Sequence, residues 1–197
     1  MLEDAIIFAT KAHAGTKRKG KNRPYILHPL EVMTIVGGIT DDEDVLAAAV
    51  LHDTVEDTDV TREDIERSFG PRIASLVAAE SENKREDRPA EETWQVRKQE
   101  TIDHLQKASR EVKLICLGDK LANLREIARD YAVLGDALWD RFNQKDKSMH
   151  GWYYGSVWRV LRDEFGNLEP IKEYQRLLVR VFGDKEEVAE WEPIYIS

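Results

Sequence analysis

The sequence predicts an all-α fold organised as one domain, and two observations carry that prediction. Apolar residues recur at helical spacing along almost the whole chain, whereas no run of β-branched residues alternates with polar ones. The chain has 197 residues, 42% of them hydrophobic, which is enough for one core that buries roughly 70% of the unfolded surface. We therefore expect one helical domain over residues 1–182 and a C-terminal tail over 183–197.

Start and stop signals divide the N-terminal half into four helices. A proline in the first turn favours a helix start near Pro29, and the glycine pair after residue 36 favours its end. Thr61 begins a capping-box pattern, and Gly70 is a typical helix stop. The helices expected from these signals and from the apolar stripes cover 2–13, about 28–36, about 41–58 and 62–69.

The C-terminal half contains a charged interruption followed by longer helices. Residues 83–91 are dense in charge and break the apolar pattern, so we expect a loop there. Ser109 is a suitable N-cap for the longest helix, and the single Cys116 within that helix is expected to be a small buried hydrophobe. The expected helices cover about 92–107, about 110–131, 133–142, 150–165 and 170–182.

Composition narrows the classes of function. A net charge of −9 and a charged fraction of 34% describe a highly charged acidic surface, which argues against nucleic-acid or anionic-membrane partners. The N-terminus lacks the basic flank and apolar run of a secretion signal, and no stretch approaches about 20 uninterrupted apolar residues. With one cysteine, no internal disulfide can form. We expect a cytoplasmic protein, and its oligomeric state stays open.

One short segment concentrates ionisable side chains. His52 and Asp53 are adjacent, and Glu56 and Asp57 follow four residues after each of them. In a continuous helix, side chains four residues apart lie roughly 6 Å apart at Cβ, which predicts two stacked rows of polar groups. The seven residues before His52 are apolar, so the rows adjoin the core. Such groups are costly to bury unless they are paired or bound to a metal.

Two further residues extend this cluster across the chain. In the longest helix Asp119 shares an otherwise largely apolar stripe, and His28 follows an apolar approach at the start of its helix. Together with His52 and Asp53 they offer two nitrogens and two carboxylates, a set that suits Mn²⁺, Fe²⁺ or Zn²⁺. Any one of these side chains alone could be a satisfied polar group in a helical core. The joint pattern favours a metal centre.

A basic loop lies between the first two expected helices. Within seven residues of an acidic protein stand five cations, Lys17, Arg18, Lys19, Lys21 and Arg23. Beside a carboxylate-rich metal site, such a cluster can hold a polyphosphate that the acids alone would repel. A solvated loop is the alternative explanation. Three other histidines, His13, His104 and His150, lack ligand partners at helical spacing, and we expect them to be structural or surface groups.

Three segments in order resemble the HD superfamily of metal-dependent phosphohydrolases, which implies an HD-type helical bundle. More narrowly, residues 24–29 (PYILHP), 52–58 (HDTVEDT) and 119–125 (DKLANLR) are similar to the hydrolase domain of RelA/SpoT-type enzymes and to the stand-alone small alarmone hydrolases. The similarity extends over about residues 1–165. A bare His-Asp pair is a weak signal, whereas three segments in register are specific.

The resemblance implies a function and a role for each matching residue. Family members remove the 3′-pyrophosphate from guanosine tetra- or pentaphosphate and release GDP or GTP. The family's metal ligands, which usually bind Mn²⁺, match His28, His52, Asp53 and Asp119. The acids that act on the attacking water match Glu56 and Asp57. The nucleotide contacts match Arg18, Lys19 and Asn123. The basic loop is one residue longer than in the long enzymes, so Lys17 and Lys21 are alternative positions for the Arg-Lys match.

Three other functions remain open on the sequence. Another HD phosphohydrolase, acting on deoxynucleotides or on the 2′-phosphate of NADPH, needs the same metal site. A non-catalytic sensor would bind the alarmone but would have no need of Glu56 and Asp57. A nucleic-acid-binding protein requires a broad basic face, which the net charge of −9 does not favour. The expected partner is therefore a small nucleotide.

Overall fold

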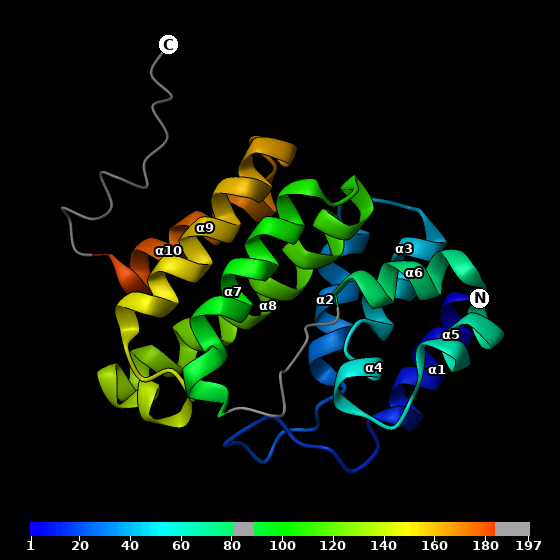
Figure 1. The fold of residues 1–197 in the computed structure, drawn as a ribbon, viewed down its shortest axis with the longest axis horizontal. Helices are drawn as coiled ribbons and strands as arrows, with labels where there is room; N and C mark the ends of the chain where they lie inside the picture. The colour runs from blue at the N-terminus through cyan, green and yellow to red at the C-terminus, as the bar shows by residue number, and fades with distance from the viewer. Residues whose placement is uncertain (81–88, 184–197) are drawn as a thin grey trace. The chain divides into compact units, whose positions relative to one another are not determined.

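The structure is a computed structural model of the 197-residue chain that describes residues 1–80 and 89–183. Apart from one isolated bridge, its regular structure is helical and the described residues form no strand, which confirms the all-α prediction (Figure 1). The helices are α1 (Leu2–Ala12), α2 (Leu27–Gly37), α3 (Glu43–Leu51), α4 (Thr54–Asp57), α5 (Arg62–Phe69), α6 (Pro71–Glu80), α7 (Ala90–Lys107), α8 (Arg110–Leu134), the 3-10 helix η1 (Gly135–Arg141), α9 (Lys147–Phe165) and α10 (Glu169–Phe182). No described helix is both long and apolar enough to cross a bilayer.

The chain divides into two compact units. The first comprises residues 1–84 and 107–122, and therefore holds α1 to α6 and the start of α8. The second comprises residues 85–106 and 123–197, with α7, the rest of α8, η1, α9 and α10. The expected tail and most of the expected charged loop lie outside the described residues, so the domain boundary at residue 182 stays a prediction.

Helix α3 forms the centre of the first unit. It packs against α1, α2 and α6, and its residues 47–51 are fully buried. Three of these are consecutive alanines, whose small side chains let neighbouring helices approach closely. The side chain of Asp42 caps the helix by accepting hydrogen bonds from the amides of Asp44 and Val45. The apolar segment before His52 is thus a core helix, as its composition predicted.

Aromatic side chains form much of the core of the second unit. Trp139 and His150 stack with ring centroids 4.9 Å apart, and Trp94 meets His150 edge-on. Tyr153 is 4% exposed and belongs to this cluster, where it meets Trp94 edge-on. Arg125 and Glu173 tie α8 to α10 through two hydrogen bonds of 2.6 and 2.7 Å. His150 is therefore a structural group, as expected.

The prediction of one continuous helix over about 41–58 is wrong. Helix α3 ends at Leu51, His52 and Asp53 form a turn, and α4 is a single helical turn. Two side chains compete with the helical hydrogen bonds at this point, because Thr54 Oγ1 donates to the Leu51 carbonyl and the His52 ring contacts the Ala49 carbonyl. Asp53 and Asp57 nevertheless keep the predicted i+4 relation, because the Asp57 amide donates to the Asp53 carbonyl at 2.9 Å.

Helix α6 was not predicted, whereas the capping signals around it were correct. Thr61 and Asp64 form the predicted capping box, and Gly70 ends α5 with a φ of 88°. Pro71 then occupies the first position of α6, where its missing amide hydrogen costs nothing. The Gly-Pro pair therefore ends one helix and begins the next, and of these two roles only the stop was predicted. The expected helix at 133–142 is the 3-10 helix η1.

Candidate metal centre

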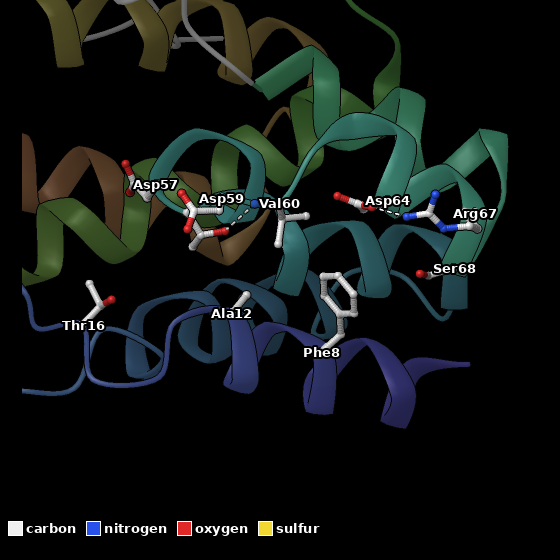
Figure 2. A pocket seen from close by; sticks show the side chains of 10 residues that line it. Phe8, Ala12, Thr16, Asp57, Asp59, Val60, Asp64, Arg67 and Ser68 are labelled. Carbon is white, nitrogen blue, oxygen red and sulfur yellow. Dashed lines mark hydrogen bonds and ion pairs between the residues drawn. The ribbon is translucent and has the colours of Figure 1, made fainter.

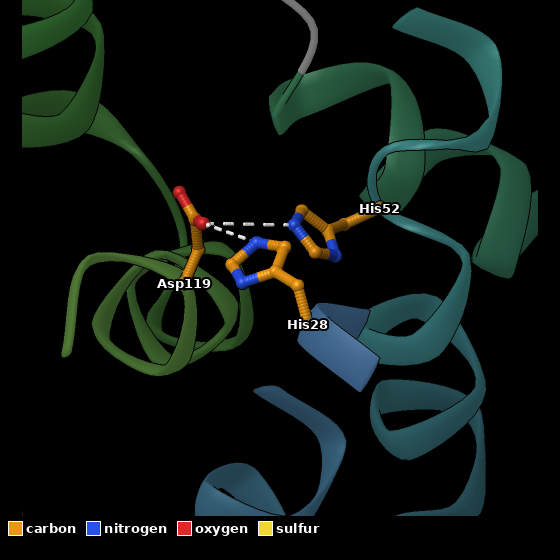
Figure 3. A group of neighbouring side chains, drawn as sticks. All are labelled: His28, His52 and Asp119. Atoms are coloured by element: carbon orange, nitrogen blue, oxygen red, sulfur yellow. Dashed lines mark ion pairs between the residues drawn. The ribbon is translucent and has the colours of Figure 1, made fainter. Parts of the chain in front are cut away.

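Three buried side chains from three separate segments of the first unit converge on one point. His28 lies in the first turn of α2, His52 directly follows α3, and Asp119 lies in α8. Each is at most 6% exposed, and one ligand atom from each lies within 4.8 Å of the others (Figure 3). Asp119 Oδ1 is 3.0 Å from His28 Nε2 and 3.7 Å from His52 Nε2. Segments distant in sequence thus build one centre.

Asp53 brings a second carboxylate to the same centre. Its Oδ2 atom lies 3.4 Å from His28 Nε2 and 3.1 Å from His52 Nε2. The turn that interrupts the helix at His52 and Asp53 places both side chains of the pair beside the cluster. The structure therefore brings together all four residues that the sequence analysis proposed as metal ligands.

Gly118 allows α8 to approach α2 closely enough for Asp119 to reach His28. A Cβ atom at this position would lie 2.8 Å from Val36 Cγ2 and 3.1 Å from Val32 Cγ1, both on α2. Val32 and Val36 are fully buried, so neither side chain has room to move away. The glycine that precedes Asp119 is thus part of what positions the carboxylate.

The hydrogen bonding of His52 suits a metal ligand. Its Nδ1 atom lies 2.8 Å from the carbonyl oxygen of Ala49, which can only accept, so Nδ1 carries a proton. Its Nε2 atom is buried and makes no hydrogen bond, although two carboxylates stand nearby. A metal-binding histidine usually donates a hydrogen bond from one ring nitrogen to a carbonyl or carboxylate and binds the metal through the other ring nitrogen. The residues present therefore fit a divalent ion.

The two histidines and two carboxylates of this centre form a tight ion-paired group. Burial alone would lower the pKa of His52, but the carboxylates of Asp53 and Asp119 outweigh burial and raise this pKa well above its usual range. Burial alone would likewise raise the pKa of both carboxyl groups, yet neighbouring positive charges hold each pKa below its usual range. A metal entering this site must displace the proton of His52, so its affinity rises with pH.

The two predicted catalytic acids lie in α4, next to the cluster. Glu56 is half-buried, and Asp57 is exposed. Tyr25 donates from its hydroxyl to Asp57 Oδ2 and to Asp53 Oδ2, with both distances at 2.7 Å. Burial, reinforced by Asp53 and Asp57, raises the pKa of Tyr25 above its usual range, so the phenol remains a donor. Sequence reasoning missed Tyr25, although it stands in the quoted PYILHP segment.

The basic loop is held against this tyrosine. The amide of Tyr25 donates to the Thr16 carbonyl at 2.9 Å, and the Arg18 amide donates to the Arg23 carbonyl at 3.0 Å, which closes the loop at its base. The guanidinium carbon of Arg18 lies 5.3 Å from the centroid of the Tyr25 ring. Lys19 is exposed. The loop therefore lies beside the metal centre, as the polyphosphate interpretation requires.

His13 also belongs to this neighbourhood, which its sequence spacing did not indicate. Its ring stacks on Tyr25 with centroids 4.8 Å apart, and it is 2% exposed. Burial lowers its pKa in spite of the opposing charges of Asp53 and Asp57. Asn123, the proposed nucleotide contact, lies one turn beyond Asp119 along α8, in the second unit. Its role stays a prediction.

A groove of about 560 Å³ lies between α1 and the α4–α5 segment (Figure 2). Its walls combine apolar side chains with hydroxyls and acids, namely Phe8, Ala12, Thr16, Asp57, Thr58, Asp59, Val60, Asp64, Arg67 and Ser68. Asp57 thus contacts Tyr25 and also lines this groove. The catalytic acid proposed from the sequence has open space beside it.

Metal-free protein is expected to lose stability between about pH 5 and pH 8. Burial raises the pKa of Glu80 to about 7, with the charge of Lys120 opposing and that of Asp119 reinforcing the shift. A carboxyl whose folded pKa exceeds its unfolded value stabilises the fold at low pH, and this contribution is lost as the pH rises through the folded value. The raised pKa of His52 acts in the same direction.

Thermal unfolding of chelated protein at several pH values checks this expectation. Glu80→Gln should reduce the fall in Tm by several degrees, because 1 kcal/mol corresponds to about 2–4 °C in a chain of this length. Glu63→Gln, which changes an exposed acid on α5, should follow the wild type. An equal fall in all three proteins would contradict the assignment to Glu80.

Fold and site together define an all-helical protein with a buried centre that can hold a metal. The profile of the HD domain family matches residues 5–145, which is more than half of the chain. This chain belongs to the HD domain family, whose members are metal-dependent, and the predicted resemblance is confirmed.

Two named proteins are similar in sequence to most of this chain. A Danio rerio protein, guanosine-3′,5′-bis(diphosphate) 3′-pyrophosphohydrolase MESH1, is 39% identical over 133 residues, which is 66% of this chain and 70% of that protein. The GTP pyrophosphokinase rsh of Brucella ovis is 30% identical over 96% of this chain, which spans 27% of that longer protein.

Two solved structures share the fold. One is a metazoan ortholog of SpoT, described as hydrolysing ppGpp, with a TM-score of 0.70, 31% identity, and coverage of 89% of this chain and 93% of that one. The other is a protein of Listeria monocytogenes EGD-e, with a TM-score of 0.67, 32% identity, and coverage of 84% and 99%. The match extends over residues of both compact units, so the single-domain HD-type fold is confirmed.

Proposed function

We propose that this chain is a metal-dependent hydrolase that removes the 3′-pyrophosphate of guanosine tetra- and pentaphosphate and releases GDP or GTP. The observation that carries the proposal is the buried His28, His52 and Asp119 cluster, with an open imidazole nitrogen, in a chain similar to enzymes named for this reaction. The single buried, free cysteine suits a reducing compartment, so we place the reaction in the cytoplasm.

The proposed metal ligands are His28, His52, Asp53 and Asp119. Two imidazoles and two carboxylates suit Mn²⁺, which is our first choice, and also Fe²⁺ or Zn²⁺. An ion held there would supply Lewis-acid activation of water near neutral pH. His28, His52 and Asp119 are buried, and Asp53 lies beside both histidines, so the four side chains are already close together.

Glu56 and Asp57 are the proposed acids of the reaction. One of them accepts a proton as the oxygen of water forms a bond to phosphorus, and the bond between phosphorus and the ribose 3′-oxygen breaks. The leaving 3′-oxygen takes up a proton, so the products are a free 3′-hydroxyl and pyrophosphate. Carboxylates in this role contribute about 10²–10⁴-fold to a rate.

Arg18 and Lys19 are proposed to hold the nucleotide, with Asn123 as a further contact. Arg18 lies against the ring of Tyr25, whose amide is hydrogen-bonded to Thr16 at the base of the loop. A guanidinium offers a plane that stacks on a base as well as donors for phosphate oxygens. The basic loop therefore gives an acidic protein a local place for a highly charged small substrate.

A substrate panel tests the function directly. Metal-loaded protein is offered guanosine tetraphosphate, NADPH and deoxynucleotides, and the products are identified by chromatography. Release of pyrophosphate and GDP from guanosine tetraphosphate is the expected result. Orthophosphate from NADPH, or triphosphate from a deoxynucleotide, would instead identify a different HD phosphohydrolase. Protein that binds metal and alarmone without turnover would be a sensor.

Replacing Arg18 by alanine is expected to raise KM about tenfold or more, with a smaller change in kcat, because the loop chiefly binds the ground-state substrate. The guanosine and adenosine tetraphosphates should be compared, since a guanidinium that reads the base affects them unequally. Arg62→Ala, which removes an exposed arginine of α5, is the matched control. Equal losses on both nucleotides would show that Arg18 does not distinguish the base.

A further inference from the structure

One hydroxyl joins a proposed metal ligand to a proposed catalytic acid. Tyr25 Oη lies 2.7 Å from Oδ2 of both Asp53 and Asp57, and both contacts are within the first unit. A phenol has a single proton, so this one donor serves two carboxylates that would otherwise repel each other. Hydrogen bonds from a hydroxyl to a carboxylate are among the strong ones.

The ring that carries this hydroxyl is fixed by contacts on the ring and on its backbone. His13 stacks on it with an angle of 29° between the planes, and Arg18 lies against it. Both nitrogens of His13 are buried and make no hydrogen bond, so His13 acts on Tyr25 through the packing of its ring. The Tyr25 amide is bonded to Thr16 at 2.9 Å. The hydroxyl therefore has little freedom to leave the two carboxylates.

The Asp57 side chain has space for a second orientation. It is exposed, and it lines the groove between α1 and the α4–α5 segment (Figure 2). Without the hydroxyl between them, repulsion from the Asp53 carboxylate would favour rotation of the Asp57 side chain toward that groove. An exposed acid that must act at a defined point near a metal needs a restraint.

We propose that Tyr25 is a positioning residue that holds the Asp57 carboxylate beside the metal centre through its hydroxyl. The proposal rests on the hydrolase function assigned above and adds a contact that couples Asp57 to the proposed ligand Asp53. Because Arg18 packs on the same ring, the tyrosine also links the substrate-binding loop to the acid.

Tyr25→Phe removes the hydroxyl and keeps the ring under His13 and Arg18. At saturating Mn²⁺ we expect kcat to fall about 10- to 100-fold, with KM within about twofold of wild type. Tyr131→Phe is the matched control, because it also removes a phenol-to-carboxylate bond, that from Tyr131 to Asp136 in the second unit. A rise in KM at constant kcat would make Tyr25 a substrate contact, and recovery of kcat in excess Mn²⁺ would make it a support of metal binding. Either result overturns the proposal.

A double-mutant cycle distinguishes action through Asp57 from a general structural effect. If Tyr25 acts through Asp57, then Tyr25→Phe should change kcat less than about twofold in an Asp57→Asn background, because residues that act as a unit are not additive. A further tenfold loss in the double variant would show that the hydroxyl acts independently of Asp57, and the proposal would fail.

A readout on the resting protein separates this proposal from the proposed function. The Tyr25 hydroxyl proton should give a slowly exchanging NMR resonance that disappears in Tyr25→Phe and shifts in Asp57→Asn, but not in Tyr131→Phe. If the wild type shows this resonance but has no hydrolase activity, the positioning hydrogen bond is supported and the hydrolase assignment is refuted. Turnover of guanosine tetraphosphate with a resonance insensitive to Asp57→Asn would retain the hydrolase and refute the positioning role.

Discussion

Replacing Asp119 by alanine is expected to abolish metal binding and turnover together. Asp119 is the buried one of the two carboxylates beside the histidines, and its Oδ1 lies 3.0 and 3.7 Å from their Nε2 atoms. Without it, His28 and His52 would have to hold a divalent cation with Asp53 alone. Activation of water and stabilisation of phosphoryl charge by a metal are worth several kcal/mol, so kcat/KM should fall at least about 10³-fold. Metal content after dialysis and the rate of pyrophosphate release measure the two losses.

The control must remove an acid without touching the centre. Asp163→Asn serves, because Asp163 is exposed on α9, where it pairs with the neighbouring Arg162. Circular dichroism and thermal unfolding establish that the Asp119→Ala protein is folded, which matters because Asp119 also pairs with the partly buried Lys120. A folded Asp119→Ala protein that keeps a full equivalent of metal and normal turnover would show that the ion binds elsewhere.

The ligand cluster was accessible from sequence because its members combine polar chemistry with positions on apolar stripes. Asp119 lies on the buried face of α8, among Cys116 and Ile127, as helical periodicity predicted. Periodicity reports which face is buried, and a carboxylate on a buried face must be paired or bound to a metal. Periodicity identified the buried polar residues, and the family resemblance predicted that they converge on one ion.

The shape of the backbone at His52 was not accessible in the same way. The segment has helical composition on both sides, and its break depends on the Thr54 hydroxyl and the His52 ring taking carbonyls of α3. Such side-chain hydrogen bonds differ little in free energy from the helical hydrogen bonds they replace, and the spacing of apolar residues does not reveal which of them form. The error of the prediction was to extend α3 through this turn, whereas the i+4 relation of Asp53 and Asp57 is retained.

Tyr25 and His13 were missed for a different reason. The partners of the Tyr25 hydroxyl stand 28 and 32 residues away in the chain. Local spacing carries no record of contacts over such distances, and a tyrosine in an apolar approach is most simply a core residue. His13 was expected to be structural or at the surface, and its ring does pack, but it packs against the tyrosine that contacts Asp53 and Asp57. In the structure, both ring nitrogens of His13 are buried and make no hydrogen bond, and this unusual environment singles out His13 and the Tyr25 beside it.

Glu56→Gln is expected to separate chemistry from metal binding. Glu56 lies in α4, beyond the turn that carries His52 and Asp53, and it is not among the four proposed ligands. The amide keeps the size of the side chain but cannot accept a proton from water, so kcat should fall about 10²–10⁴-fold while metal content stays at one equivalent. Glu66→Gln, an exposed acid on α5, is the matched control.

The combination of Glu56→Gln with Asp119→Ala discriminates among the functions that share this fold. A hydrolase loses turnover in both variants but loses metal only in the second. A sensor shows no turnover to lose, and its affinity for guanosine tetraphosphate should be insensitive to Glu56→Gln, since binding needs the cations of the loop and not a proton acceptor. Normal turnover in Glu56→Gln would exclude Glu56 as the acceptor and leave that role to Asp57, whose position depends on Tyr25.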